Sequence, residues 1–417
     1  MSEAADHFPS GVPADPENAL QSQSDRWLAA WLAASRLSDL QALRPAIDWD
    51  RFVAAAGRRG LSGLLLGQAD RLGLSLPPPV AHSLRQRSLG VAAAELHAAA
   101  ELEPVVRALH QAGIEVMLLK GAALQRTVYH RPGLRPMCDV DLLVRYRSAV
   151  DAVGVLVDQG CRLGMELVGD DFFATYYFER ELMTASPTPL RIDLHARPFR
   201  PLPTARTVPD NALWSDARTV EVGKVPVRIP RVELMFLHLA VHAAFHGCDR
   251  LLWLYDLKRV AGEAGDAMDW SLITRRACDW RLSLPLLFAL EKTGELLGPV
   301  CPHHVIATLR SHRTGWKDRL VLRQAPRDAD SPAMHVAVNV LCTPGIRFRL
   351  GYLRAMLLPG RGHLGDVYPF RHPGWTACAH VWRLIRACGR LSAVPFRALA
   401  GKVGSNREVW PAENPVS

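Results

Sequence analysis

The spacing of apolar residues changes twice along the chain. From Trp27 to Leu72, and again from Val80 to Ala112, apolar side chains recur every three to four positions, which is typical of helices. Short apolar runs then follow at 114–119, 140–144, 190–195 and 225–229, and each run predicts a strand. Helical spacing returns at Glu233 and continues to about 340. Since strands and helices interleave in the middle of the chain, we expect an α+β fold.

These changes of pattern predict five segments. Residues 1–24 are acidic and rich in Pro, Ser and Ala, and we expect a disordered tail. An N-terminal helical segment at 25–110 precedes the α+β core at 111–235, and a helical domain follows at 236–342. The last segment, 343–417, is basic and interrupted by Pro and Gly.

Composition excludes several classes of protein. Hydrophobic residues make up 49% of the 417 residues, which allows a large core and argues against a disordered chain. The eight cysteines are scattered without a Cys-x-x-Cys pair, so neither a disulfide scaffold nor a four-cysteine zinc site is expected. We see no signal peptide, and the longest uncharged run, 331–346, is too short for a transmembrane helix. A cytoplasmic, bacterial protein is the expectation.

The net charge of +9 has one location. Residues 343–402 carry ten Arg and Lys against a single acid, Asp366, so the rest of the chain is balanced. Such a segment can bind nucleic acid, an anionic membrane or an acidic partner. The simpler interpretation is that the arginine stems cover the helical domain while the charged groups stay in water. We therefore expect this segment to pack on the body of the protein without binding nucleic acid specifically.

Candidate chemistry is concentrated between residues 120 and 193. Lys120 and Gly121 follow the first predicted strand, Asp139 and Asp141 lie at alternate positions of the second, and Asp193 lies in the third. Residues two apart in a strand point to the same face, so Asp139 and Asp141 project together. A glycine at a strand-to-helix turn lets a phosphate approach the backbone, and a lysine there supplies a positive charge.

Three carboxylates on neighbouring strands repel one another unless a cation neutralises them. Hard oxygen ligands suit Mg²⁺ or Mn²⁺, and two such ions can hold the attacking and leaving oxygens of a phosphoryl displacement. Alternating acids are also common on exposed strands, so an Asp-x-Asp alone indicates little. The ordered set of Lys-Gly, Asp-x-Asp and a third Asp with apolar flanks is what favours a nucleotide site.

The same set resembles the DNA polymerase β-like nucleotidyltransferase superfamily, and within it the family of uncharacterised nucleotidyltransferases. The resemblance rests on GIEVMLLKGAAL at 113–124, GLRPMCDVDLLV at 133–144 and DLHA at 193–196. It extends upstream to IDW at 47–49 and downstream to 237–257, and covers roughly residues 45–300. Two departures stand out: Lys-Gly replaces the superfamily's usual Gly-Gly or Gly-Ser, and the last motif lacks the family's aromatic residue.

The resemblance implies a polymerase β-like core flanked by helical segments, and transfer of a nucleoside monophosphate from an NTP such as ATP with release of pyrophosphate. It implies Asp139, Asp141 and Asp193 as the catalytic, metal-binding residues. Lys120 and Gly121 would then hold the triphosphate together with Arg135. The predicted helix 237–257 would lie beside the core, so His242 is a nucleotide-binding candidate as well.

Several alternatives stay open on the sequence. His238, His242 and His246 recur every four residues and are either site residues or hydrogen-bonded core residues. The chain could also be a non-catalytic binding module, or could transfer the γ-phosphate as a kinase does. The acceptor could be a small molecule, a peptide, a protein or an RNA end.

Overall fold

We describe a computed structural model of the chain, at residues 22–164, 172–324 and 332–357. The predicted tail at 1–24 and the basic segment beyond 357 therefore lie almost wholly outside the described residues. The chain divides into two compact units, and residues up to Tyr352, which include every strand, belong to the first. No described helix is long and apolar enough to cross a membrane.

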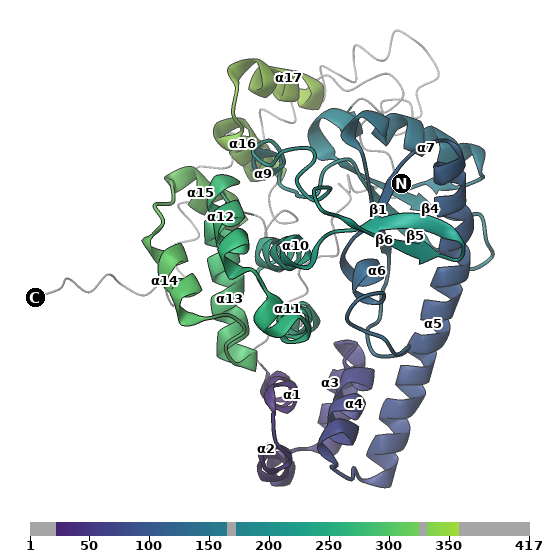
Figure 1. Cartoon of the computed structure of the whole chain (residues 1–417), viewed down its shortest axis with the longest axis vertical. Helices are drawn as coiled ribbons and strands as arrows, with labels where there is room; N and C mark the ends of the chain where they lie inside the picture. Colours follow the sequence, from purple (N-terminus) through teal and green to yellow (C-terminus); the bar gives the residue numbers. More distant parts are fainter. Residues whose placement is uncertain (1–21, 165–171, 325–331, 358–417) are drawn as a thin grey trace, which may run out of the picture. The chain divides into compact units, whose positions relative to one another are not determined.

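The first unit holds one mixed sheet, which confirms the α+β prediction (Figure 1). The strand order is β3-β4-β5-β2-β1-β7-β6. Strand β2 pairs with β5 in parallel, as β1 does with β7, and the other neighbours are antiparallel. The strands are β1 (Val116–Leu118), β2 (Val140–Val144), β3 (Arg162–Leu163), β4 (Glu179–Met183), β5 (Arg191–His195), β6 (Arg218–Val222) and β7 (Val225–Ile229).

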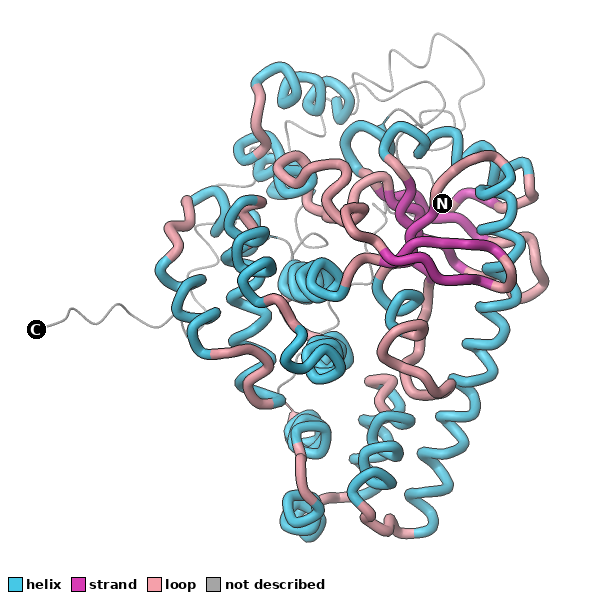
Figure 2. Tube along the Cα trace, viewed as in Figure 1, coloured by secondary structure: helices cyan, strands magenta, loops and turns pink. Residues whose placement is uncertain are grey.

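Helices make up most of the described chain (Figure 2). Those before and within the sheet region are α1 (Gln23–Ala33), α2 (Leu37–Leu43), α3 (Trp49–Arg58), α4 (Ser62–Leu72), α5 (Pro78–Gln111), α6 (Lys120–Leu124), α7 (Ala149–Asp158) and α9 (Leu202–Ala205). Those after it are α10 (Val232–Phe245), α11 (Leu251–Ala264), α12 (Trp270–Asp279), α13 (Ser283–Leu297), α14 (His303–Ser311), α15 (Trp316–Gln324), α16 (Pro332–Cys342) and α17 (Ile346–Leu357).

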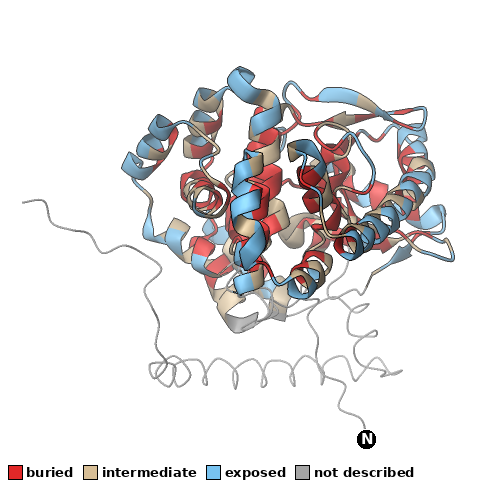
Figure 3. Cartoon of the chain, turned by 90° about the horizontal axis from the view of Figure 1, so that it is seen from below, coloured by how far each residue is buried: buried red, intermediate tan, exposed pale blue. Residues whose placement is uncertain are grey.

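The core forms where these layers meet. Helix α5 packs along β1, β6 and β7 and against α3, α4 and α7, while α10, α11 and α13 pack on one another. Helix α1 bridges the two sets, since it contacts α3 and α4 as well as α13. Figure 3 shows the buried residues on the inward sides of the helices and the exposed ones on their outer sides. In β2 and β5 the apolar Leu142, Ile192 and Leu194 are fully buried and alternate with acids, which fixes the register of these strands.

A buried ion pair joins the loop before β2 to α11. The Arg135 guanidinium donates to both carboxylate oxygens of Asp256, with Nη2 2.9 Å from Oδ2, and the Tyr129 hydroxyl donates to Oδ1 at 2.8 Å. Asp256 is 0% and Arg135 5% exposed. Burial of a charge is costly without a partner, so the three groups depend on one another. They fix the loop that leads into the Asp-x-Asp strand.

We predict that Asp256→Ala lowers the free energy of unfolding by about 3–5 kcal/mol, because it leaves the Arg135 charge buried without its partner. Chemical denaturation followed by circular dichroism measures this loss. The matched control is Asp266→Ala, since Asp266 is exposed in the 3-10 helix Gly265–Ala267 that follows α11 and should change stability little. A loss below about 1 kcal/mol in Asp256→Ala would contradict the assignment of this pair as a structural anchor.

Candidate nucleotidyltransferase site

Three adjacent strands bring acidic residues to one face of the sheet. In the parallel pair β2–β5, Asp141 lies opposite Asp193. In the antiparallel pair β4–β5, Glu179 lies opposite His195 and Glu181 opposite Asp193. Because side chains alternate along a strand, all five project from the same face. The structure thus brings together Asp141 and Asp193, which the sequence predicted, with an additional glutamate pair from β4.

Asp141 is the most enclosed of these carboxylates, with 4% of its surface exposed. Its Oδ1 atom accepts from Lys120 Nζ at 2.6 Å and lies 2.9 Å from His195 Nε2. Burial alone would raise the pKa of Asp141, but the Lys120 ammonium and the His195 hydrogen bond outweigh it and hold the pKa far below its usual range. Asp141 is therefore ionised at neutral pH.

Lys120 reaches Asp141 from a turn between β1 and α6. Its φ angle is 42°, in the left-handed region that residues other than glycine rarely adopt. Burial would lower the pKa of Lys120, but the Asp141 and Glu179 carboxylates raise it, so the ammonium stays charged. Lys120, which the sequence predicts as a phosphate-binding residue, thus faces the carboxylates in the structure.

Gly121 has a packing role that its neighbours explain. A Cβ atom at this position would overlap Arg135 Nη1 and lie 2.7 Å from Met137 Sδ, so a larger residue would have to displace these two side chains. Arg135 is engaged with Asp256, as described above, and the structure shows it supporting the Gly121 turn. The sequence predicts that Arg135 binds phosphate. In the structure its guanidinium is already paired with the buried Asp256 carboxylate.

Asp193 experiences the repulsion of its neighbours. Burial, followed by the charges of Glu179, Asp141 and Asp139, raises the pKa of Asp193 to about 7. The nearest positive group is Arg191, whose Nε lies 3.7 Å from Asp193 Oδ1. That guanidinium also pairs with Asp139. Burial and the nearby carboxylates together disfavour the ionised form of Asp193.

Glu179 was not predicted as a site residue. Its carboxylate accepts from Arg200 Nη1 at 3.0 Å and lies 3.8 Å from His195 Nδ1, so His195 sits between Glu179 and Asp141. Burial would raise the pKa of Glu179, but the Arg200 guanidinium lowers it to about 2. The alternation Glu-Arg-Glu-Leu-Met at 179–183 is the signal that could have identified this strand and its acids.

The carboxylates can be tested for their fit to a divalent cation. Asp139, Asp141, Asp193 and Glu179 supply the hard oxygen donors that Mg²⁺ prefers, and the raised pKa of Asp193 shows that added positive charge would be stabilising. In the described part of the chain, however, no three Asp, Glu, His or Cys side chains already converge as metal ligands. Lys120 and Arg191 instead partly neutralise the acids. The carboxylate oxygens and their negative charge therefore suit a divalent cation. In the structure, Asp141 is paired with Lys120 and Asp139 with Arg191.

Helix α10 contributes histidines beside these groups. His238 is buried and its Nε2 lies 2.8 Å from the Pro198 carbonyl oxygen; burial, with the Lys120 charge, lowers its pKa to about 3. This matches the alternative of a hydrogen-bonded core histidine. His242 is half-buried, and burial together with the Lys120 charge holds its pKa well below the usual value. Its ring centroid lies 4.7 Å from that of Trp253. His242 therefore remains neutral and belongs to an aromatic pair near Lys120.

Comparison with known proteins adds a family to this geometry. No curated protein matches the chain. The sequence model of the family described as uncharacterised nucleotidyltransferase matches residues 45–298, which is more than half of the chain. That range contains the Lys120 turn, the acids of β2, β4 and β5, and helices α10 and α11. The chain therefore belongs to the uncharacterised nucleotidyltransferase family.

Proposed function

We propose that this protein transfers a nucleoside monophosphate from an NTP to an acceptor hydroxyl or amine and releases pyrophosphate. The observation that carries the proposal is the pairing of Asp141 with Asp193 on parallel strands, with an excess of negative charge around Asp193. Membership of a nucleotidyltransferase family supports the type of reaction. In the reaction the acceptor atom forms a bond to the α-phosphorus as the bond between that phosphorus and the bridging oxygen breaks.

Each residue of the site has a separate role in this proposed reaction. Asp139, Asp141 and Asp193 would hold Mg²⁺ or Mn²⁺, which when bound neutralises charge on the phosphates. Asp193 is the group suited to accept the acceptor proton, since a base with a pKa near neutrality is effective at neutral pH. Lys120 supplies a fixed charge for the triphosphate. His195 contacts the same Asp141 oxygen as Lys120 and helps to keep the orientation of that carboxylate.

The nucleobase would bind at the α10–α11 corner. His242 and Trp253 present aromatic surfaces there, and the Arg250 guanidinium lies 4.7 Å from the Trp253 ring centroid. Trp253 and His242 are both half-buried, so each keeps some accessible surface. Aromatic faces stack on bases with little sequence preference, which fits a site whose NTP is not specified by hydrogen-bonding groups. His242 thereby keeps the nucleotide-binding role that the sequence suggested, as part of a pair with Trp253.

The first test follows the label of the nucleotide. The protein, Mg²⁺ and ATP labelled at either the α- or the γ-phosphorus are incubated with a small-molecule cell extract, and the products are separated by chromatography. We expect the α-label in a new product, with pyrophosphate released. In Asp141→Asn this transfer should fall below about 1% of wild type, because one carboxylate no longer carries charge.

The matched control is Asp158→Asn, which changes an exposed acid at the end of α7 and should leave transfer unchanged. Transfer of the γ-label instead would identify a kinase-type reaction. Binding of ATP without transfer of either label would identify a non-catalytic module. Either result would overturn the proposal.

The second test uses the pH dependence of stability without metal. Because the pKa of Asp193 is raised from 3.8 to about 7 by folding, the native state binds more protons between these values, and stability falls as pH rises through this interval. Asp193→Asn removes this cost. Its free energy of unfolding should therefore exceed that of wild type by roughly 1–3 kcal/mol at pH 8 and by less at pH 5.

Urea denaturation in EDTA at the two pH values measures this difference, with Asp158→Asn again as the control. Adding Mg²⁺ at pH 8 should then stabilise the wild type more than Asp193→Asn. Equal stability of the two proteins at pH 8 would contradict the excess of negative charge on which the metal assignment depends.

A further inference from the structure

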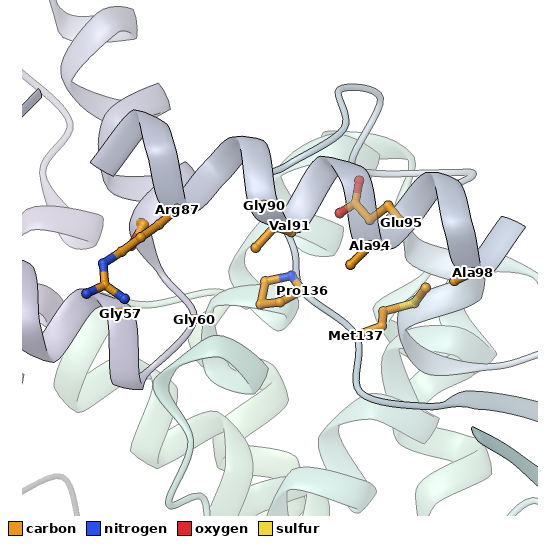
Figure 4. Close-up of a pocket in the computed structure, with 11 residues that line it drawn as sticks. Gly57, Gly60, Arg87, Gly90, Val91, Ala94, Glu95, Ala98, Pro136 and Met137 are labelled. Atoms are coloured by element: carbon orange, nitrogen blue, oxygen red, sulfur yellow. The ribbon is translucent and has the colours of Figure 1, made fainter. Parts of the chain in front are cut away.

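A groove lies beside the candidate site, between α5, the α3–α4 turn and the loop before β2 (Figure 4). Its volume is about 300 Å³, at the lower end of the range for small-molecule sites. Helix α5 forms one wall along Arg87, Val91 and Ala94, and Pro136 and Met137 face it from the loop. We refer to it as the α5 groove.

The two ends of the α5 groove differ in chemistry. At one end the Arg87 guanidinium lies against Gly57, and no described carboxylate is within ion-pair distance of it. The middle is apolar, with Val91 and Pro136. At the other end Met137 lines the groove and also packs against Gly121, at the turn that carries Lys120. The groove therefore runs from an available positive charge to the edge of the catalytic turn.

Ser62 begins α4 and also lines the α5 groove, but its hydroxyl does not open onto it. The residue is 4% exposed, and its oxygen is fully enclosed by the protein without a hydrogen-bond partner. The charged groups that line the groove are Arg87 and Glu95, so a ligand would meet a positive group and a carboxylate at different points along α5.

The loop wall of the groove is held in place by α5. The Gly133 carbonyl accepts from Ser88 Oγ at 2.9 Å, and its amide donates to Glu95 Oε2 at 2.9 Å. On the α4 side, a Cβ at Gly63 would lie 2.0 Å from the Gly133 carbonyl oxygen, so α4 and the loop are in close contact. A groove with both walls fixed loses little freedom when a ligand binds, which favours affinity.

We infer that the α5 groove binds the acceptor substrate, and that this acceptor is a small hydroxy acid: a compact apolar molecule with a carboxylate or phosphate at one end and a hydroxyl at the other. The anion would pair with Arg87, whose planar fork matches either group. The hydroxyl would face Met137, two residues before Asp139. The role of this ligand as acceptor rests on the proposed function, but its binding in the α5 groove does not.

The hydroxyl of a ligand bound in this way would be the group that receives the nucleoside monophosphate. The hydroxyl oxygen bonds to the α-phosphorus of the NTP, the bond to the bridging oxygen breaks, and pyrophosphate carries away its electron pair. The hydroxyl proton passes to Asp193. The acid group at Arg87 takes no part in this chemistry. It fixes which end of the acceptor enters the site, so the groove would select for molecules with the two groups at opposite ends.

Binding can be measured without any nucleotide. A panel of small hydroxy acids that includes p-hydroxyphenylpropionate and tyrosol phosphate, each beside a neutral analogue such as p-hydroxyphenylpropionamide, is titrated into the full chain and followed by ligand-observed NMR. We expect acids to bind more tightly than their neutral analogues. Whether carboxylates or phosphates bind better identifies the anion.

Three variants locate the binding. Arg87→Gln should lower the affinity for the acids about fivefold or more and leave the affinity for the neutral analogues unchanged. Arg85→Gln, an exposed arginine of α5 that does not line the groove, is the matched control and should have no effect. Ala94→Leu should exclude acids and analogues alike, because it fills the middle of the groove. Since Ala94 is exposed, its thermal unfolding should stay close to that of wild type.

The inference is overturned if no acid binds more tightly than its neutral analogue, or if Arg87→Gln keeps full affinity. If acids bind in the groove but no nucleotide is transferred, the groove assignment stands and the proposed reaction is overturned. If nucleotide is transferred although no acid binds in the groove, the reaction stands and the groove assignment is overturned.

Discussion

Sheet register is the constraint on which the rest of this site depends. Once Leu142 and Leu194 are buried on one face, the parallel pairing of β2 with β5 places Asp141 directly opposite Asp193 on the other. Neither carboxylate can move away without taking a core residue with it. The surrounding cations follow from this forced proximity: Lys120 neutralises Asp141 and Arg191 pairs with Asp139. Asp193 is buried beside these carboxylates, and its burial together with their repulsion raises its pKa.

Much of this fold could be predicted from the pattern of apolar residues. The runs at 140–144 and 225–229 are strands with the predicted bounds, because short buried strands leave an unambiguous apolar signature. Strands β4 and β6 were missed for the opposite reason. They carry the charged residues Glu179, Glu181 and Arg218, so their average hydropathy resembles that of a loop. They form strands since each pairs with a neighbour that is buried.

The site was predictable to the extent that spacing alone determines geometry. Asp139 lies directly before β2 and Asp141 within it, and Lys120 begins α6 one residue after β1, so local sequence suggested these positions. The partner of Arg135 was not predictable, because Asp256 is 121 residues away and meets it only through helix packing. The same applies to Glu179, which reaches His195 through strand pairing. Long-range contacts thus decide which of several plausible charged residues is free to act and which is already engaged.

Helix α5 connects distant parts of the molecule. Its 34 residues extend for about 50 Å, with Pro104 inside the C-terminal part. There Glu101 accepts from Thr184, just after β4, and Glu103 lies against Gly223 in the β6–β7 turn. The N-terminal half carries Arg87 and also Ser88, whose hydroxyl donates to the Gly133 carbonyl in the loop before β2. A displacement of that half of α5 would therefore reach the loop that leads into Asp141 as well as the outer strands.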